Sequence, residues 1–246
     1  MKKIIIFCFA IIFIGSDSIA QQLYTQESTV LLKNEAEGGF FLHSQGFGFN
    51  FRKGKNITAL RKWFWEIDAL SMYSPRETST INPYFQNAKS YIFGKMNSFD
   101  IIRFGYGRQN IIYGRENKGG IEIRLNYSAG LSMGFTIPIY LDILESDPYG
   151  NYQEVIKKYD PSTDPQENIL GKASFTYGLG EIQPHPGLYG KFGFSFEDIN
   201  ENHNIYVLET GLAIDAYPKE IPIMALTQNN NVFITLYVNF MFGKKW

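Results

Sequence analysis

Between Gly119 and Tyr140 the chain alternates between large apolar residues and polar or small ones. The odd positions of this stretch include Ile123 and Leu131, whereas the even positions include Glu122 and Arg124. A period of two is the period of an extended strand, whose side chains point alternately to its two faces. Because the polar face consists of charges and glycines, the pattern predicts a barrel wall with lipid outside and a narrow polar interior.

The same alternation recurs along the chain and predicts eight strands. Their approximate bounds are 39–53, 60–73, 88–97, 100–113, 119–140, 186–197, 204–217 and 231–243. The segment 119–140 is long enough to contain a turn and to form two strands. The only helical pattern lies between Tyr149 and Tyr159.

Alternation also fits a soluble barrel with its apolar face inward, so the volume of the interior decides between the two. An eight-stranded barrel has an interior just wide enough for side chains to fill it. The large apolar side chains of eight strands would not fit there, whereas a bilayer accepts them all. Glycine also falls on the charged face, at Gly46, Gly48, Gly94, Gly105, Gly107, Gly193 and Gly211. We therefore predict an all-β fold class, a single eight-stranded antiparallel transmembrane β-barrel with one long extracellular loop.

The N-terminus has the features of a cleaved signal peptide. Lys2 and Lys3 precede a short apolar run, and small residues follow at the usual cleavage positions. The run is too short to span a membrane, which takes about 20 apolar residues. We expect a signal peptide at 1–20, a periplasmic segment at 21–38 and the barrel domain at 39–246, which places the protein in the bacterial outer membrane.

Composition supports this interpretation. The net charge is −1, so the chain lacks the electrostatic footprint of a nucleic-acid-binding protein. Aromatic residues make up 16% of the chain, and there are 23 glycines. The only cysteine, Cys8, lies in the predicted signal peptide, so the exported chain would have no cysteine chemistry.

The end of the chain is also typical of an outer-membrane barrel. It reads ITLYVNFMFGKKW, an amphipathic strand that finishes in aromatic residues. Aromatic girdles mark the two membrane interfaces of such barrels. The residues predicted to form these girdles are Trp63, Trp65, Tyr106, Tyr127, Tyr140, Tyr217 and Trp246.

Connections should be short on the periplasmic side and long outside. The longest, 141–185, is predicted to be an external loop, and 218–230 a second one. The segment 114–119 suits a periplasmic turn. The segment 74–87 would have to be periplasmic as well, although it is long for such a turn.

The inward face of the predicted barrel carries ten charged residues. They are Arg52, Lys62, Glu66, Asp68, Arg103, Glu122, Arg124, Lys191, Glu209 and Asp215. Five are cations and five are anions, and unpaired charges in a narrow lumen would cost several kcal/mol each. We predict an ion-pair network that plugs the barrel, with an ion-conducting pore or a proton path as the alternative.

No catalytic, cofactor-binding or metal-binding set can be assigned. A hydrolase would need a histidine beside a serine and a carboxylate, but His43, His185 and His203 have no such partner at a recognisable spacing. Asp160 and Asp164 lie in the long loop, yet the spacing of a calcium loop is absent. We therefore expect no enzyme activity, no cofactor and no metal.

Several blocks of the sequence resemble a family of small, uncharacterised outer-membrane barrels of the Bacteroidota. These blocks are Glu66-Ile67-Asp68, RFGYGRQ from Arg103, GGIEIRLNYSAGLSMG from Gly119, AYPKEIPIMA from Ala216 and the final FGKKW. The resemblance implies the fold and the location, and a role as accessory subunit of an envelope machine for barrel assembly or secretion. It supplies no catalytic residues.

Three hypotheses for the function follow. The first is a structural or accessory subunit that contacts membrane lipid and other envelope proteins. The second is a small pore or transporter. The third is a lipid-modifying outer-membrane enzyme.

Overall fold

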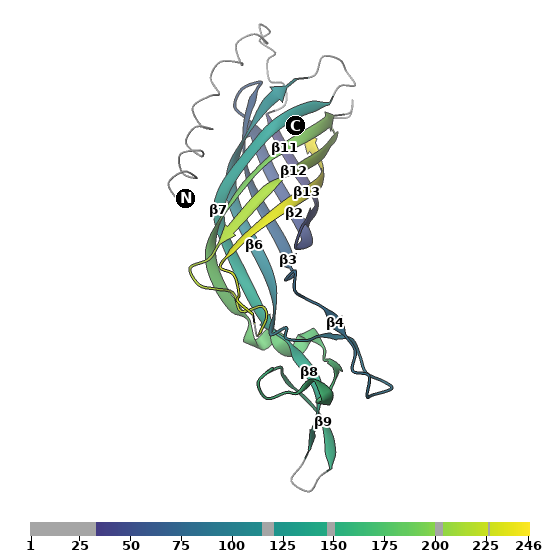
Figure 1. Ribbon diagram of the computed structural model, residues 1–246. Coiled ribbons are helices and arrows are strands. Elements are labelled where there is room, and N and C mark those ends of the chain that lie inside the picture. Colours follow the sequence, from purple (N-terminus) through teal and green to yellow (C-terminus); the bar gives the residue numbers. More distant parts are fainter. Residues whose placement is uncertain (1–32, 115–120, 147–150, 200–203, 226) are drawn as a thin grey trace, which may run out of the picture. The chain divides into compact units, whose positions relative to one another are not determined.

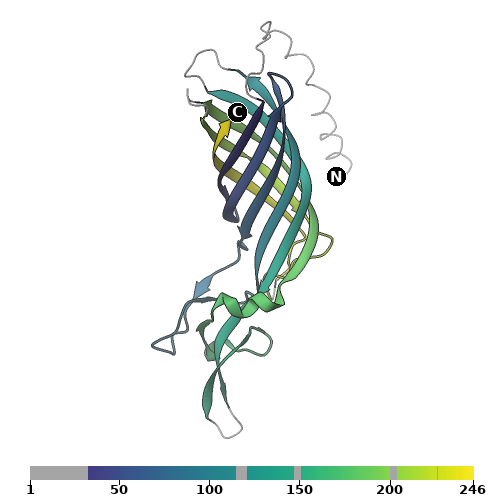
Figure 2. The ribbon, with the colours of Figure 1, turned by 180° about the vertical axis from the view of Figure 1, so that it is seen from behind.

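The computed structural model describes residues 33–114, 121–146, 151–199, 204–225 and 227–246. The predicted signal peptide and residues 21–32 of the predicted periplasmic segment lie outside these residues. Eight strands form a closed antiparallel barrel, in which β1 pairs with both β2 and β13 (Figures 1 and 2). These strands are β1 (Asn34–His43), β2 (Gly46–Asn56), β3 (Arg61–Met72), β6 (Asn97–Tyr113), β7 (Glu122–Pro138), β11 (Gln183–Ile199), β12 (Asn204–Ala216) and β13 (Val232–Lys245). The barrel begins at Asn34, ahead of the predicted boundary at Gly39.

The two faces of the barrel wall differ as the alternation predicts. Outward-facing Phe49, Leu131 and Leu236 are 64%, 64% and 65% exposed, whereas inward-facing Arg52 is fully buried. An apolar outer face around a polar interior is the arrangement of a transmembrane β-barrel. The predicted fold class is thus confirmed. Among the described residues, no helix has the length and apolar character needed to cross a membrane.

The predicted number of strands is right, but two of the predicted strands are wrong. The segment 39–53 is a hairpin of β1 and β2 rather than one strand, because the chain turns at Ser44 and Gln45. Gly46 follows with a φ of 153°, and a Cβ there would lie 2.0 Å from the carbonyl oxygen of Ser71. Glycine is therefore needed where the hairpin closes against β3.

The predicted strand 88–97 is not part of the barrel. Only β5 (Tyr91–Ile92) forms there, and it pairs with β4 (Ser79–Thr80) outside the barrel. Gly94, with a φ of 77°, ends this short strand. The connection 73–96 consequently joins β3 to β6 at the end of the barrel that carries the other long connections, so 74–87 is not a turn of the opposite end.

Within the segment 119–140, the described residues Glu122–Pro138 form one barrel strand, β7, without a turn. A separate strand, β8 (Tyr140–Ser146), follows it outside the barrel. The helix suggested for Tyr149–Tyr159 is wrong, because Tyr152–Lys158 is strand β9 and pairs with β8 along its whole length.

We call the described parts of the connections 73–96, 139–182 and 217–231 the loop module. Its three-stranded sheet has the order β10-β8-β9, with β10 at Ile169–Lys172, and two 3-10 helices accompany it, η1 (Gln166–Asn168) and η2 (Phe175–Glu181) (Figure 1). The sheet buries an apolar core of its own, made of Tyr91, Ile139, Leu141, Ile143, Tyr159 and Ile169. At the opposite end of the barrel, which we call the short-turn end, four residues, 57–60, join β2 to β3, and the strand bounds leave only 114–121 and 200–203 for the other two connections.

Candidate functional site: the filled lumen and the loop module

The ten predicted lumenal charges all come from barrel strands and lie on the inward face. Nine of them are buried, and Glu122, at the short-turn end, is half-buried. They form three layers along the barrel, which we describe from the centre outward.

The central layer is built around two carboxylates. Glu209 accepts two hydrogen bonds from the guanidinium of Arg52, at 2.7 and 3.1 Å. Glu66 accepts one from Arg52 at 3.0 Å and one from the ammonium of Lys191 at 2.7 Å. Arg52 also lies 4.3 Å above the ring of Phe64. Charge-assisted bonds of this kind are the strongest polar contacts that side chains make.

Neutral donors complete the coordination of these carboxylates. Ser128 donates to Glu66 at 2.6 Å, and Tyr189 donates to it at 3.1 Å. Tyr237 and Asn126 donate to Glu209 at 2.8 and 2.7 Å. The sequence analysis did not identify these four residues as partners of the two carboxylates, although each has the inward parity of its strand.

The layer toward the loop module pairs Arg103 with Asp215, whose Oδ1 lies 2.8 Å from the guanidinium Nε. Asp68 lies 3.5 Å from Arg103 Nη1. Ser132 donates to Asp215 at 3.0 Å and shares a 2.8 Å hydrogen bond with the hydroxyl of Tyr217. Tyr217 was predicted to be interfacial, but it is buried, because the chain turns inward after β12 and its ring packs on Phe99 and Phe233.

An apolar cluster closes the barrel above this layer. Its members are Met72, Phe99, Ile101, Tyr217, Ile221, Ile223, Met224 and Phe233. The residues of the 217–231 connection therefore fold into the mouth of the barrel rather than away from it.

The layer at the short-turn end contains charges that were not predicted. Glu35 and Glu37 lie in the segment assigned to the periplasm, Glu197 lies at the end of a predicted strand, and Lys245 lies two residues beyond the last one. All four are buried. Their inward parity was the signal that would have identified them, since Glu197 continues the row of Lys191 and Ser195.

With these additions the described lumen holds six cations and eight anions rather than five of each. The cations are Arg52, Lys62, Arg103, Arg124, Lys191 and Lys245, and the anions are Glu35, Glu37, Glu66, Asp68, Glu122, Glu197, Glu209 and Asp215.

Three of the anions lie together. The carboxylate oxygens of Glu35, Glu37 and Glu197 are within 4.8 Å of one another. Basic side chains already contact this group: Lys62 bonds to Glu35, and Arg124 lies 2.9 Å from Glu197. Its counter-charge is therefore supplied by the protein itself.

The predicted interfacial aromatics fall into two groups. Trp63, Trp65, Tyr106 and Tyr127 face outward from barrel strands, and Trp246 is exposed just after β13. Tyr140 is not on the barrel wall, because it belongs to β8 of the loop module. Its hydroxyl donates to Glu181, and this hydrogen bond raises the pKa of Tyr140 above its ordinary value.

Polar contacts, as well as the apolar core, join the connections of the loop module to one another. The side chain of Asn82 donates to three carbonyl oxygens, those of Gln166, Glu167 and Ile169, at 3.2, 2.9 and 2.9 Å. These bonds join the connection 73–96 to the connection 139–182, so the two form one folded unit.

Asp160 and Asp164, the two aspartates of the long loop that were considered for calcium, both contact groups of the protein. Asp164 lies 2.7 Å from the ammonium of Lys157, and its hydrogen bond to Lys157 raises the pKa of that lysine. Asp160 accepts from the hydroxyl of Ser162 at 2.6 Å, and this bond lowers the pKa of Asp160. Both carboxylates thus have protein donors, and the absence of a calcium site stays a prediction.

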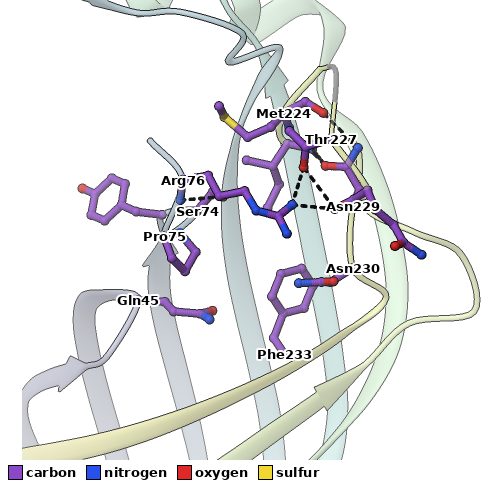
Figure 3. A pocket seen from close by; sticks show the side chains of 12 residues that line it. Gln45, Ser74, Pro75, Arg76, Met224, Thr227, Asn229, Asn230 and Phe233 are labelled. Atoms are coloured by element: carbon purple, nitrogen blue, oxygen red, sulfur yellow. Dashed lines mark hydrogen bonds between the residues drawn. The ribbon is translucent and has the colours of Figure 1, made fainter. Parts of the chain in front are cut away.

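A pocket of about 220 Å³ opens between two long connections at the mouth of the barrel (Figure 3). Arg76 crosses it to donate to Thr227 and to the carbonyl oxygen of Gln228, the latter at 3.0 Å. Asn229 organises the far wall by accepting from the backbone N–H groups of Ile223 and Met224, each at 3.1 Å. Phe233 and Met224 add apolar surface to this mostly polar set of lining residues.

Two of the three histidines lie among the described residues. His43 accepts a bond from the backbone N–H of Gln45 at 3.3 Å. His185 shares a 2.9 Å hydrogen bond with the hydroxyl of Thr136. His203 lies outside the described residues.

No protein-family model matches the sequence, and no curated protein matches it either. Among solved structures, the chain is similar to Ail, the attachment invasion locus protein of Yersinia pestis, at 9% identity over 87% of this chain and 99% of that one, with a TM-score of 0.41 for its complex with the heparin analogue sucrose octasulfate. It is also similar to Neisserial surface protein A, at 11% identity over 87% of this chain and 97% of that one, with a TM-score of 0.41. Similarities this distant support no inference about a ligand or an activity. Membership of the Bacteroidota family stays a prediction.

Proposed function

We propose that this protein is an outer-membrane barrel that works as an interaction subunit: the barrel anchors the loop module, and the loop module binds another protein of the cell envelope. The observation that carries the proposal is the contrast between the two ends of the molecule. Three connections at one end fold into a unit with its own sheet and core, whereas the strand bounds leave only 57–60, 114–121 and 200–203 to join strands at the other end.

The filled lumen supports an anchoring role over a transport role. Arg52, Glu66 and Glu209 are completely buried at its centre, and the apolar cluster around Phe99 and Phe233 closes the mouth. An ion would have to break several charge-assisted hydrogen bonds to pass, each of which contributes about 1.5–3 kcal/mol. A barrel of this kind is expected to show no conductance above background in a planar bilayer.

The loop module has the exposed aromatic side chains that protein interfaces use. Tyr84 is 74% exposed and Tyr152 is 69% exposed, and they lie on different connections of the module. Tyrosine is enriched at interaction hot spots because its ring buries a large area with little loss of conformational entropy.

The test is co-purification from the native envelope in mild detergent, with the tagged protein at its native level. The wild type should recover a second envelope protein in stoichiometric amount, and Tyr84→Ser with Tyr152→Ser should reduce that recovery. Ile112→Ser is the matched control, since Ile112 is 57% exposed at the short-turn end. A wild-type barrel that purifies alone would refute the proposal.

A further inference from the structure

The outer face of the barrel at the short-turn end carries five basic residues on one group of adjacent strands. Lys53 and Lys55 lie on β2, Arg61 lies on β3, Arg108 lies on β6 and Lys244 lies on β13, and all five are exposed. With Trp63 and Trp65 of β3, which lie between them, we call this surface the basic rim patch. Among the described contacts, none of the five cations has a carboxylate partner.

The strand register sets the basic side chains beside the tryptophans. One cross-strand row reads Lys55, Trp63, Arg108, and the next reads Lys53, Trp65, Tyr106. Because neighbouring strands lie about 4.8 Å apart, the two cations of the first row are about 10 Å apart. Two or more such side chains can therefore reach a single phosphate.

Small residues separate Lys53 from Lys244. Ala36 of β1 pairs with both lysines, and Gly38 pairs with Phe51 on one side and with Phe242 on the other. Two lysines thus flank a strip of small residues, and two phenylalanines flank the same strip deeper in the apolar band.

The charge is confined to one side of the barrel. The outward-facing residues of β7, β11 and β12 at the same end include no cation among those described, and β11 presents Asp198 instead. A uniform ring of positive charge would be an ordinary solvated rim. Concentration on one sector beside tryptophans, which favour the membrane interface, indicates a ligand with an anionic head and an apolar body.

We propose that the basic rim patch binds an anionic phospholipid, with its phosphate held by Lys53, Lys244 and their neighbours and an acyl chain along Ala36 and Gly38. The inference rests on the proposed placement of the barrel in a membrane. Long basic side chains extend from the apolar wall to the headgroup level, as this arrangement requires. The attraction of each such cation to anionic lipid corresponds to about a fivefold change in affinity.

The tryptophans report directly on this surface. The chain has three tryptophans, so Trp246→Phe leaves fluorescence from Trp63 and Trp65 alone. The full mature chain in this background is reconstituted in phosphatidylcholine vesicles that contain a small fraction of brominated phosphatidylglycerol or, in parallel, of brominated phosphatidylcholine. Bromine quenches tryptophan at short range, so stronger quenching by the anionic lipid measures its enrichment at the patch.

The proposal predicts that the brominated anionic lipid quenches more strongly than brominated phosphatidylcholine. The double variant Lys53→Gln with Lys244→Gln should reduce this preference for the anionic lipid by about fivefold for each cation removed. Lys172→Gln with Lys219→Gln removes two exposed cations of the loop module and should leave the preference intact. High salt should also abolish the preference of the wild type, which tests the charge without any variant. Equal quenching by the two lipids, or a preference that survives in the patch variant or in high salt, would overturn the proposal. An absence of quenching by either lipid would instead refute the membrane placement itself.

Discussion

Gly105 tests whether the lumen is packed as tightly as the structure indicates. A Cβ at this position would lie 1.6 Å from the hydroxyl oxygen of Tyr189 and 2.6 Å from its Cζ. In Gly105→Ala the tyrosine must therefore move, and it would lose its 3.1 Å hydrogen bond to Glu66 and its 5.6 Å contact with the guanidinium of Arg103.

The magnitude follows from two contributions. Overpacking of a tight interior costs about 1–3 kcal/mol, and losing a hydrogen bond to a charged group costs about 1.5–3 kcal/mol. We expect Gly105→Ala to lower the free energy of unfolding by about 3–5 kcal/mol. Gly190→Ala is the matched control, because a Cβ there meets nothing within 4 Å on the outer face, so its effect should stay within about 0.5 kcal/mol.

The assay is urea unfolding of the refolded barrel in lipid vesicles, followed by the shift in gel migration between folded and heated samples. A double variant, Gly105→Ala with Tyr189→Phe, removes the nearest clashing atom, so it should lose less stability than the two single variants summed. If Gly105→Ala proves as stable as Gly190→Ala, the lumen has space for an additional methyl group. The inference that side chains plug the lumen would then be wrong.

Two further predictions concern charge. Glu66→Gln should cost about 3–5 kcal/mol in the same unfolding assay, because it removes the buried carboxylate that pairs with both Arg52 and Lys191 and leaves two buried cations to share Glu209, whereas Glu122→Gln at the half-buried end of the lumen should cost far less; equal costs would contradict the layered network. Since the pKa of Asp160 is lowered below its ordinary value of 3.8 by its bond from Ser162, the stability that this turn gains is present above pH 3.8 and is lost as the pH falls through the lowered pKa. The protection factors of the amides at 162–164 should therefore fall in acid, and Ser162→Ala, which loses the hydroxyl donor and keeps the backbone donor, should shift that fall toward higher pH.

Much of the barrel could be predicted from the sequence because lipid imposes a strict alternation on every strand. Rows such as Phe192, Phe194 and Phe196 against Lys191 and Ser195 leave little doubt about which face is buried. A tight turn gives a weaker signal in the sequence pattern than a strand does. The hairpin at 44–45 was missed because apolar residues resume on the far side of the turn, and only Gly46 marks the place.

The loop module shows the limit of such reasoning. Tyr91 alternates with its neighbours as a barrel residue would, yet it packs on Leu141 and Ile169 in a core that only the folded loops create. Tyr217 is likewise an aromatic residue at the end of a predicted strand, as girdle residues are. Its actual position depends on how the next connection enters the barrel mouth. Contacts between distant connections decide both cases, and no local pattern encodes them.

The charged lumen also explains how the chain distinguishes its two faces. Each barrel strand is amphipathic, and a slip of one residue in register would turn every side chain to the opposite face. In β3, such a slip would expose Lys62, Glu66 and Asp68 to hydrocarbon at a cost of several kcal/mol for each charge. A lumen filled with apolar side chains would carry no such penalty, because either face would then suit the lipid. We infer that the buried ion pairs contribute less to net stability, where desolvation offsets much of their attraction, than to the choice of one register and one inward face.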